Sequence, residues 1–436
     1  MPKMAVVSLG CSKNLVDTEI MLGRLVKHDW ELTSDFSEAE LILVNTCGFI
    51  ESAKSESIQH ILEMAAYKEP GRGRCRILAV AGCLVQRYLD DLKAEIPEVD
   101  YWIGLNQLDQ IAAIISGEPV QAGDAAPFLN NENLERYRVT LSHTAFLKIA
   151  EGCSHRCAYC AIPLIKGRYR SRVPEAIVAE AVRLVQGGVK ELNIIAQDIT
   201  MYGRDLSRDL NLRVLLERIL DEARPDWIRL LYAYPSGLDE ELLRFIGTTP
   251  NICKYLDLPF QHINERILRL MNRKENREML LERLRMIRET VPGMVLRTTF
   301  IVGFPTETDA EFEELRQFVA EGHFEHAGVF SYSREEQTPA YDLEPQIDPE
   351  VKEERRRLLL ETQQRVSARL LQRFVGREER ILIDKVYNDG RAIGRTEAFA
   401  PEVDGVVSVE GYDGPSGVFI SRRITGNDAY NLFAKK

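Results

Sequence analysis

Strand-length apolar runs alternate with helical stretches along the first 120 residues of the chain. The runs expected to be strands cover residues 4–9, 41–44, 77–81 and 101–103. The stretches between them have helical periodicity and cover residues 16–26, 51–66 and 88–95. Strands that alternate with helices form βαβ units, and these units build a parallel sheet covered by helices. Residues 1–120 are therefore expected to form an N-terminal parallel α/β domain.

A cysteine follows each of the first three predicted strands. Cys11, Cys47 and Cys83 are separated by two intervals of 36 residues. The carboxyl ends of parallel strands lie at one edge of a sheet, where ligands normally bind, so the three thiols can converge there. Three thiolates with one open position suit an iron–sulfur cluster better than they suit zinc. The alternative is three unrelated buried thiols, since free cysteine is among the most buried residue types.

A second cysteine group has much closer spacing. Cys153, Cys157 and Cys160 form a C-x3-C-x2-C motif directly after an apolar run at 145–149 that is expected to be a strand. This spacing lets one loop supply three of the four iron ligands of a cubane cluster and leaves the fourth iron open. A zinc finger would need a second ligand pair downstream, and none follows. His155 lies inside the loop and is interpreted as a hydrogen-bonding partner rather than a ligand.

Beyond this loop the alternation of strands and helices continues. The predicted strands cover 191–196, 228–234, 255–259, 296–302 and 328–332, and the predicted helices cover 174–186, 212–223, 239–246, 276–290 and 309–321. With the strand before the loop, this predicts a partial (β/α)6 TIM-type barrel over residues 139–368, whose active site belongs at the carboxyl ends of the strands. Four residues of possible function follow those strand ends: Gln197, Asp198, His262 and Gly303.

The last part of the chain loses helical periodicity. Short strands are expected at 381–386, 392–396, 406–409 and 418–424, separated by turns rich in Gly, Asn and Pro. This pattern predicts a small antiparallel β-barrel over residues 371–436.

Composition and charge exclude several classes of protein. The chain has 56 Lys and Arg residues against 67 Asp and Glu, which gives a net charge of −11. No domain is basic, which argues against binding through non-specific phosphate contacts. No window approaches the ~18 consecutive apolar residues of a membrane-spanning helix, and no signal-peptide pattern is found. A cytoplasmic globular protein is expected, in which the eight cysteines are candidates for metal binding or catalysis.

The cysteine loop, with Tyr159 before its last cysteine, resembles the signature of the radical SAM superfamily. The three N-terminal cysteines narrow this resemblance to the methylthiotransferases, and it covers the whole chain, with a TRAM-like C-terminal domain. The tRNA-modifying branch typically has Gln-Met-Asn after its first cysteine, which this chain lacks. The chain also departs from the methylthiotransferase pattern at Thr306, which follows a proline where these enzymes often have Gly. Four stretches are similar to the branch that modifies ribosomal protein S12, namely 10–19, 152–157, 255–262 and 400–405.

The resemblance implies two [4Fe-4S] clusters and S-adenosylmethionine as cofactors. The C-x3-C-x2-C cysteines would hold the cluster that chelates S-adenosylmethionine, and the three N-terminal cysteines would hold an auxiliary cluster. Gly187 and Gly188 equally fit a helix C-cap, and Gln197 and Asp198 equally fit local capping. Asp198 and His262 are weak catalytic candidates, although His262 is more typical of a hydrogen-bonded structural histidine. The expected cofactor-binding residues are Tyr159, Gly187, Gly188, Gln197, Ile301 and Gly303.

The implied reaction is methylthiolation of the β-carbon of an aspartate in ribosomal protein S12. Hydrogen abstraction by a 5′-deoxyadenosyl radical is followed by transfer of a methylthio group from the auxiliary cluster. A monomer is expected, with an electron donor such as flavodoxin or ferredoxin, a sulfur donor and no membrane as partners. The alternative enzyme is a tRNA adenosine methylthiotransferase. The alternative of another class is a non-catalytic iron–sulfur sensor or RNA-binding protein.

Overall fold

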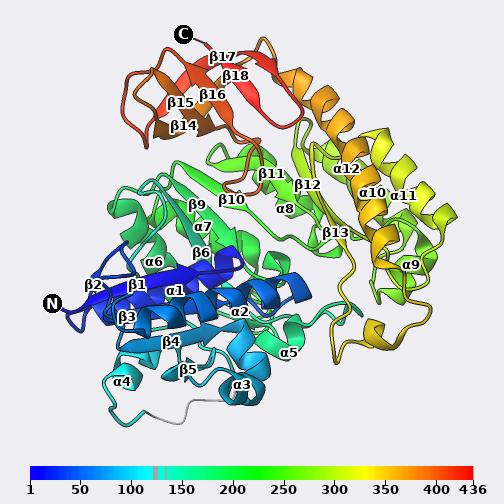
Figure 1. The fold of residues 1–436 in the computed structure, drawn as a ribbon. Helices are drawn as coiled ribbons and strands as arrows, with labels where there is room; N and C mark the ends of the chain where they lie inside the picture. Colours follow the sequence, from blue (N-terminus) through cyan, green and yellow to red (C-terminus); the bar gives the residue numbers. More distant parts are fainter. Residues whose placement is uncertain (121–125, 133–134, 436) are drawn as a thin grey trace.

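The computed structural model describes residues 1–120, 126–132 and 135–435, and Figure 1 shows three units in chain order. The N-terminal α/β domain lies beside a central open barrel of parallel strands. Helix α12 (Pro349–Leu371) then leads to a small C-terminal barrel. Within the described part of the chain, no helix is long and apolar enough to cross a membrane.

The N-terminal sheet has the strand order β2-β1-β3-β4-β5, and every strand pair in it is parallel. This is a doubly wound order that reverses direction between β1 and β3, and ligands bind at such a switch point. The predicted parallel α/β fold is confirmed, whereas the two-residue strand β2 is not predicted from the sequence. The elements are β1 (Lys3–Ser8), α1 (Ser12–Val26), β2 (Glu31–Leu32), β3 (Leu41–Thr46), α2 (Glu51–Ala65), η1 (Ala66–Lys68), β4 (Ile77–Gly82), α3 (Cys83–Glu95), β5 (Tyr101–Ile103), η2 (Leu108–Gln110) and α4 (Ile111–Ile115).

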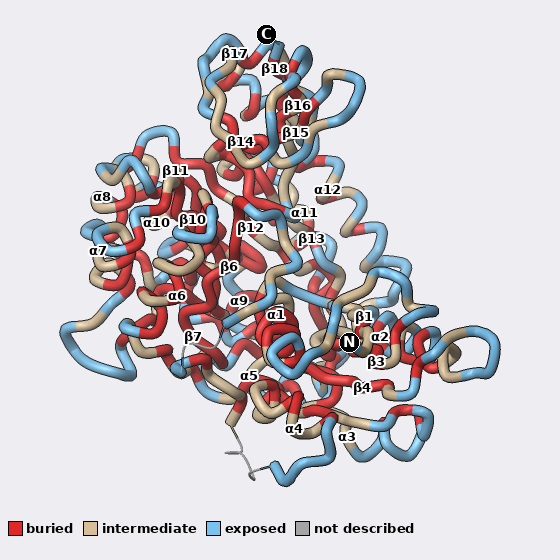
Figure 2. Tube along the Cα trace, turned by 90° about the vertical axis from the view of Figure 1, so that its left-hand side faces the viewer, coloured by how far each residue is buried: buried red, intermediate tan, exposed pale blue. Residues whose placement is uncertain are grey.

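Helices cover both faces of this sheet, which explains the apolar sequence of its central strand. Strand β3 is buried along its whole length. Leu41 and Leu43 pack toward α1 and α4, while Ile42 and Val44 pack toward α2 and α3. Helix α1 also contacts β6 (Thr144–Lys148) of the central barrel, so it is enclosed on two sides (Figure 2).

The central sheet has the strand order β13-β12-β11-β10-β9-β6, again all parallel. Consecutive strands are neighbours and helices connect them, which is the arrangement of a TIM barrel that stops after six units. The predicted partial (β/α)6 barrel is confirmed. Its further elements are β7 (Ala150–Glu151), α5 (Ile162–Lys166), β8 (Arg170–Ser171), α6 (Pro174–Gln186), β9 (Glu191–Ile195), η3 (Ile199–Met201), α7 (Leu212–Glu222), β10 (Trp227–Leu230), η4 (Pro235–Gly237), α8 (Glu240–Thr248), β11 (Ile252–Asp257), α9 (Glu265–Leu270), α10 (Arg277–Thr290), β12 (Val295–Val302), α11 (Asp309–Glu321), β13 (His326–Ser331) and η5 (Pro339–Asp342).

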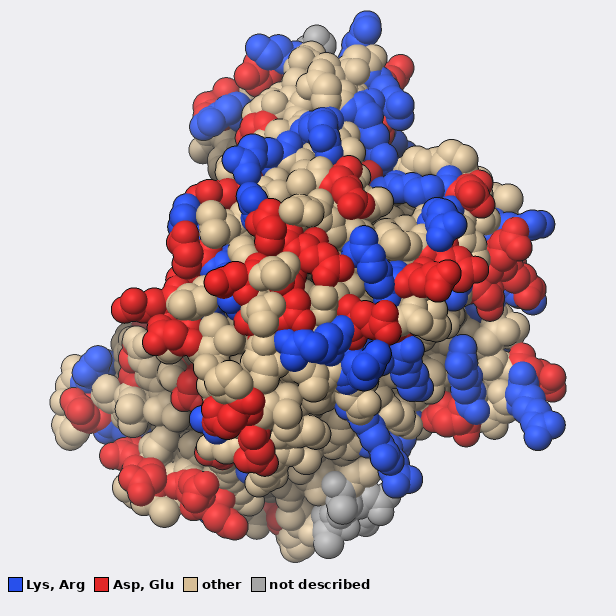
Figure 3. Space-filling model, turned by 90° about the vertical axis from the view of Figure 1, so that its right-hand side faces the viewer, with Lys and Arg blue, Asp and Glu red and all other residues tan. Residues whose placement is uncertain are grey.

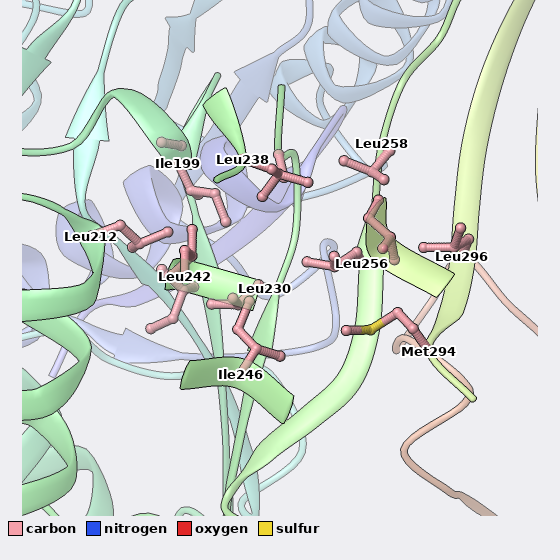
Figure 4. Packing of buried hydrophobic residues seen from close by; sticks show 14 of the residues in the cluster. Ile199, Leu212, Leu230, Leu238, Leu242, Ile246, Leu256, Leu258, Met294 and Leu296 are labelled. Atoms are coloured by element: carbon pink, nitrogen blue, oxygen red, sulfur yellow. The ribbon is translucent and has the colours of Figure 1, made fainter. Parts of the chain in front are cut away.

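The largest apolar core lies between this sheet and its helices. Figure 4 shows Leu230, Leu256 and Leu296 from three strands beside Leu212 and Ile246 from α7 and α8. Several helices begin at a side chain that accepts a hydrogen bond from the first turn, which fixes where each loop ends. These N-cap residues are Asn211, Asp239, Asn264, Asn276 and Thr308.

The C-terminal domain is a closed barrel with the order β14-β15-β16-β18-β17. The predicted small barrel is confirmed, but it is not wholly antiparallel, because β16 and β18 pair in parallel. The prediction lacks β18, a three-residue strand that is defined by its pairing with β16 and β17. The elements from the linking helix onward are η6 (Gln372–Phe374), β14 (Glu378–Val386), β15 (Arg391–Arg395), β16 (Val407–Glu410), β17 (Phe419–Asn427) and β18 (Leu432–Ala434).

The segment between β15 and β16 fills the base of the central barrel. Phe399 is fully buried, and its ring lies 5.3 Å from that of His326 at the start of β13. Asp404 accepts a hydrogen bond of 2.6 Å from the Tyr255 hydroxyl and lies 3.4 Å from Nε of Arg297. The C-terminal domain therefore docks on the amino-terminal edge of the barrel (Figure 1).

Candidate functional site

The three N-terminal cysteines lie where β1, β3 and β4 end. Cys11 is the N-cap of α1, Cys47 follows β3, and Cys83 begins α3. Gly10 has a φ of 89°, and a Cβ atom there would lie 3.2 Å from Sγ of Cys47, so a side chain at this position would crowd the thiol. Burial raises the pKa of the Cys83 thiol to about 12, and negative charge at Cys11 and Cys47 acts in the same direction. The three thiols are therefore close neighbours.

The side chain of Asn14 forms hydrogen bonds with residues at the ends of three neighbouring strands. Its Nδ2 atom donates to the carbonyl oxygens of Leu9 and Thr46, at 3.1 and 2.8 Å. The thiol of Cys83 donates to its Oδ1 atom at 3.4 Å. One buried amide thus connects residues that follow or end three parallel strands.

The C-x3-C-x2-C loop lies between β7 and α5. The N–H of Cys153 donates to the Gly167 carbonyl at 3.0 Å, and the N–H of Cys160 donates to the Cys157 carbonyl at 3.1 Å. Gly152 has a φ of 79°, and a Cβ atom there would lie 2.2 Å from the Arg168 carbonyl oxygen. Only glycine fits this position, where the chain enters the loop.

Aromatic and charged side chains support the same loop. The His155 ring stacks on Tyr234 at 3.8 Å, and its Nε2 atom donates to Oδ2 of Asp198 at 2.7 Å. The guanidinium of Arg273 lies 4.2 Å from the Tyr234 ring centre, and its Nη1 atom lies 3.8 Å from Sγ of Cys157. Asp198 lies three residues after the end of β9, so the barrel edge and the loop form one connected structure.

The two cysteine groups adjoin each other. Cys83 belongs to the same apolar cluster as Ala161 and Ile165, which follow the last cysteine of the loop. All eight cysteines are free thiols. Burial raises the pKa of Cys153 to about 11, so binding as a thiolate requires a cation to replace the proton.

Each of the two cysteine groups has the number and kind of donor atoms that an iron–sulfur cluster takes from a protein. Among the described residues, no three His, Cys, Asp or Glu side chains converge closely enough to hold one metal ion. A cubane is bound through different irons, so its cysteines stand further apart than the ligands of one ion. Three free thiols lie on one loop and three at one sheet edge, so each group can offer one ligand to each of three irons.

Several predicted cofactor-binding residues lie near the loop. Tyr159 and Ile301 are half-buried and contact one apolar cluster that contains Phe304. Gly303 has a φ of 67° and directly follows β12. The Nε2 atom of Gln197 donates to Glu151 at 2.8 Å, whereas its buried Oε1 atom has no partner among the described residues.

Gly187 and Gly188 do not join these residues. They follow α6 and precede β9, which places them at the amino-terminal edge of the sheet, away from the cysteine loop. Gly187 is the C-cap of α6, and its N–H donates to the Arg183 carbonyl at 2.9 Å. Their predicted contact with the cofactor does not agree with this geometry, whereas the helix-capping alternative does.

His262 also has a structural environment. It is fully buried, its Nε2 atom lies 3.0 Å from Oε1 of Glu307, and its Nδ1 atom accepts from the N–H of Asn264 at 3.0 Å. With both ring nitrogens engaged it cannot take a substrate proton, so the weak catalytic prediction for it is not supported. Glu307 also accepts from the N–H of Gly303 at 2.7 Å, so His262 helps to hold the turn after β12.

Sequence reasoning missed Arg273, Tyr234 and Asn14. Arg273 follows a helix end and touches a cysteine 116 positions earlier, a separation that no local pattern indicates. Asn14 lies in the quoted stretch 10–19, but its role depends on three strands. Thr306, the noted departure, has a φ of 70°, the region that glycine adopts most readily.

The arrangement defines a radical SAM fold with a second cysteine group at its edge. Family models match three parts of the chain: an uncharacterized protein family, UPF0004, over residues 3–104, the radical SAM superfamily over residues 147–319, and the TRAM domain over residues 375–436. Membership in the radical SAM superfamily implies S-adenosylmethionine and a [4Fe-4S] cluster as cofactors.

Curated relatives identify the particular family. The chain is 45% identical to the ribosomal protein uS12 methylthiotransferase RimO of Geobacter sulfurreducens, with 99% of this chain and 98% of the relative covered. The relative of the same name from Clostridioides difficile is also 45% identical, with the same coverage of both chains. The chain belongs to this family of radical SAM methylthiotransferases.

Solved structures agree with the fold. A radical S-adenosylmethionine methyltransferase, TsrM, from Kitasatospora setae, solved with cobalamin and a [4Fe-4S] cluster, has a TM-score of 0.57 at 16% identity. The match covers 78% of this chain and 77% of that one. The cobalamin-dependent radical enzyme OxsB has a TM-score of 0.52 at 12% identity, covering 83% of this chain and 56% of that one. At these identities the likeness shows the fold alone.

Proposed function

We propose that this chain methylthiolates the β-carbon of an aspartate in ribosomal protein S12. The observation that carries the proposal is the junction of two cysteine triads at the carboxyl edges of two parallel sheets, where Cys83 packs with Ala161 and Ile165. A methylthio transferase needs a sulfur-bearing site beside a site that activates carbon. The substrate class is supported by relatives whose name specifies uS12 and which match the chain over nearly its whole length.

Two [4Fe-4S] clusters would be held by the two triads. When bound, the clusters and S-adenosylmethionine supply the electron, the hydrogen abstraction from an unactivated carbon and the sulfur that is transferred. The chain contributes the positions of these groups. The ligands of the cluster that binds S-adenosylmethionine would be Cys153, Cys157 and Cys160, and those of the auxiliary cluster would be Cys11, Cys47 and Cys83.

The chain's own side chains would orient and enclose the reacting groups. Arg273 donates toward Sγ of Cys157, which stabilises negative charge on that sulfur. The partnerless Oε1 atom of Gln197 is available to accept a hydrogen bond from the amino group of the cofactor. Tyr159 and Ile301 line an apolar wall beside the loop, which suits an adenine ring and excludes water.

The acidic chain favours a basic partner such as a ribosomal protein. Figure 3 shows one face of the molecule, which carries both acidic and basic side chains, with several basic side chains in a band across its middle. An electron donor of the flavodoxin or ferredoxin type and a sulfur donor complete the proposed set of partners, and the proposed enzyme is a monomer.

The test uses the reconstituted, reduced protein with S-adenosylmethionine and small ribosomal subunits under anaerobic conditions. Formation of 5′-deoxyadenosine and the mass of S12 are measured together for the wild type, Cys47→Ala and Cys157→Ala. We expect both products from the wild type, neither from Cys157→Ala, and 5′-deoxyadenosine without methylthiolation from Cys47→Ala. Methylthiolation at full rate by Cys47→Ala would contradict the proposal that the N-terminal triad supplies the transferred sulfur and the loop triad the hydrogen abstraction.

A further inference from the structure

A buried cluster of four charged side chains lies between the two cysteine groups. It consists of Asp17 in α1, Lys148 in β6, Glu151 in β7 and Lys166 in α5, each at most 3% exposed. Lys148 pairs with Asp17 and lies 2.8 Å from Glu151. Lys166 lies 3.2 Å from Asp17 and 3.5 Å from Glu151. Each cation therefore contacts both anions, so all four charges are compensated.

Three members of this cluster belong to elements that begin or end beside a cysteine. Helix α1 begins directly after Cys11, strand β7 ends two residues before Cys153, and helix α5 begins two residues after Cys160. The ion cluster therefore connects the elements that carry the two triads. Since removing one partner of a buried ion pair leaves an uncompensated buried charge and is strongly destabilising, the cluster holds the triads in one fixed arrangement.

The two lysines differ in what they face. Negative charge at Glu151, Asp17, Cys83 and Cys11 raises the pKa of Lys166, although burial lowers it. For Lys148, burial also lowers the pKa, and the charges that raise it are those of Asp17 and Glu151. Lys166 directly follows Ile165, which packs in the same apolar cluster as Cys83. Helix α5, which carries Lys166, contacts α3, which begins at Cys83. Lys166 is thus a buried cation on the side of the N-terminal triad.

A buried cation beside a cluster held by thiolates favours the more negative, reduced state, because net charge and surroundings set the reduction potential of such clusters. Lys148 supplies the same charge to the same ion cluster, and the negative charges that act on it most are those of Asp17 and Glu151. A comparison of variants at the two lysines therefore separates the contribution of the ion cluster to stability from the effect of the Lys166 charge on the reduction potential.

We propose that Lys166 is a positioning residue that fixes the auxiliary cysteines against the radical SAM loop, and that its buried charge raises the reduction potential of the auxiliary cluster. The inference rests on the proposed assignment of Cys11, Cys47 and Cys83 to an iron–sulfur cluster. It concerns a residue outside both triads and outside the residues that would contact S-adenosylmethionine.

The test compares Lys166→Met with Lys148→Met and Lys166→Arg in a background in which the three loop cysteines are Ala, so that only the auxiliary cluster is present. Thermal unfolding is measured on the metal-free chain, and the midpoint potential of the reconstituted cluster is measured by an anaerobic redox titration followed by EPR. We expect both Met variants to unfold at lower temperature. Only Lys166→Met should shift the potential to more negative values, and Lys166→Arg should restore it.

An unchanged potential in a folded Lys166→Met variant, or an equal shift in Lys148→Met, would overturn the inference while leaving the cluster assignment intact. A background chain that binds no iron would overturn the assignment and the inference with it. If Lys166→Met does not accumulate as folded protein, Asp17→Asn tests the same claim with the opposite sign. Removing that anion should shift the potential to more positive values, and a negative or absent shift would contradict the role of Lys166.

Discussion

The imidazole of His155 donates a hydrogen bond of 2.7 Å to the carboxylate of Asp198, across 43 residues of sequence. His155 lies inside the cysteine loop, whereas Asp198 lies three residues after the end of strand β9. Asp198 also accepts from the N–H and the hydroxyl of Thr200, at 2.8 and 2.6 Å, so its carboxylate is held in place. The loop is therefore anchored to a strand end of the barrel by the protein's own side chains.

Replacing His155 by Ala should loosen the cysteine loop. A hydrogen bond to a charged group contributes about 1.5–3 kcal/mol, and the stacking on Tyr234 is lost as well. We expect faster loss of iron to a chelator from a chain that carries only the loop triad. His28→Ala is the control, because His28 is exposed just past the end of α1 and its ring donates a hydrogen bond of 2.8 Å to the nearby Arg24 carbonyl. Equal rates of iron loss for both variants would show that the anchor is not needed.

Single Cys→Ala replacements should divide the eight cysteines into three groups. A change in either triad should remove the iron of that triad, keep the iron of the other and abolish methylthiolation. Cys75→Ala and Cys253→Ala are matched controls, because both thiols are buried and outside the triads. Iron content and S12 mass are the measurements. Loss of iron in either control, or retention of full iron in a triad variant, would contradict the assignment.

Arg395 should be essential for docking the C-terminal barrel. It is 3% exposed and pairs with Glu191 of β9 at 2.6 Å and with Asp384 at 2.7 Å. Arg395→Met leaves buried carboxylates without their partner, which should cost about 3–5 kcal/mol of unfolding free energy. Arg391→Met on the same strand removes an exposed arginine and should change little. Denaturant unfolding of the metal-free chain measures the unfolding free energy of both variants. Similar losses of unfolding free energy in Arg395→Met and Arg391→Met would exclude a special role for Arg395.

The same interface should weaken in acid. Burial raises the pKa of Glu191, but Arg395 and Arg229 outweigh this, so the net pKa lies below the ordinary 4.5. A lowered folded pKa contributes stability that is present above the ordinary pKa and is lost as the pH falls through the folded value. Glu191→Gln should therefore be less stable at neutral pH and show a flatter decline in thermal unfolding temperature toward acid. A decline as steep as that of the wild type would assign the acid sensitivity to other carboxylates.

Most of the fold could be predicted because its signals are local. Strand β3 begins with the apolar run 41–44, and each of the three N-terminal cysteines comes within three residues of the end of an apolar run. Strands β2 and β18 have only two and three residues, so neither shows a period. The parallel pair of β16 and β18 depends on closure of the barrel rather than on a sequence pattern.

The part of the site that lies on one loop could be predicted from the sequence, whereas the contacts between segments distant in the sequence could not. The C-x3-C-x2-C spacing indicates a cluster by itself, whereas the contacts of Lys148 with Asp17 and of Arg273 with Cys157 join residues 131 and 116 positions apart. Gly187 and Gly188 show the opposite error. Paired glycines fit both a helix end and a cofactor contact, and only the sheet edge on which they lie distinguishes the two.

The most direct test of the proposed function is to locate the methylthio group. The reconstituted enzyme, reductant and S-adenosylmethionine are incubated anaerobically with small ribosomal subunits and bulk tRNA together, and both products are analysed by mass spectrometry. The account predicts a methylthio group on the β-carbon of an aspartate of S12 and none on tRNA. A methylthio group on a tRNA adenosine would contradict the substrate assignment, and no transfer to either by a chain that carries both clusters would contradict the proposed activity.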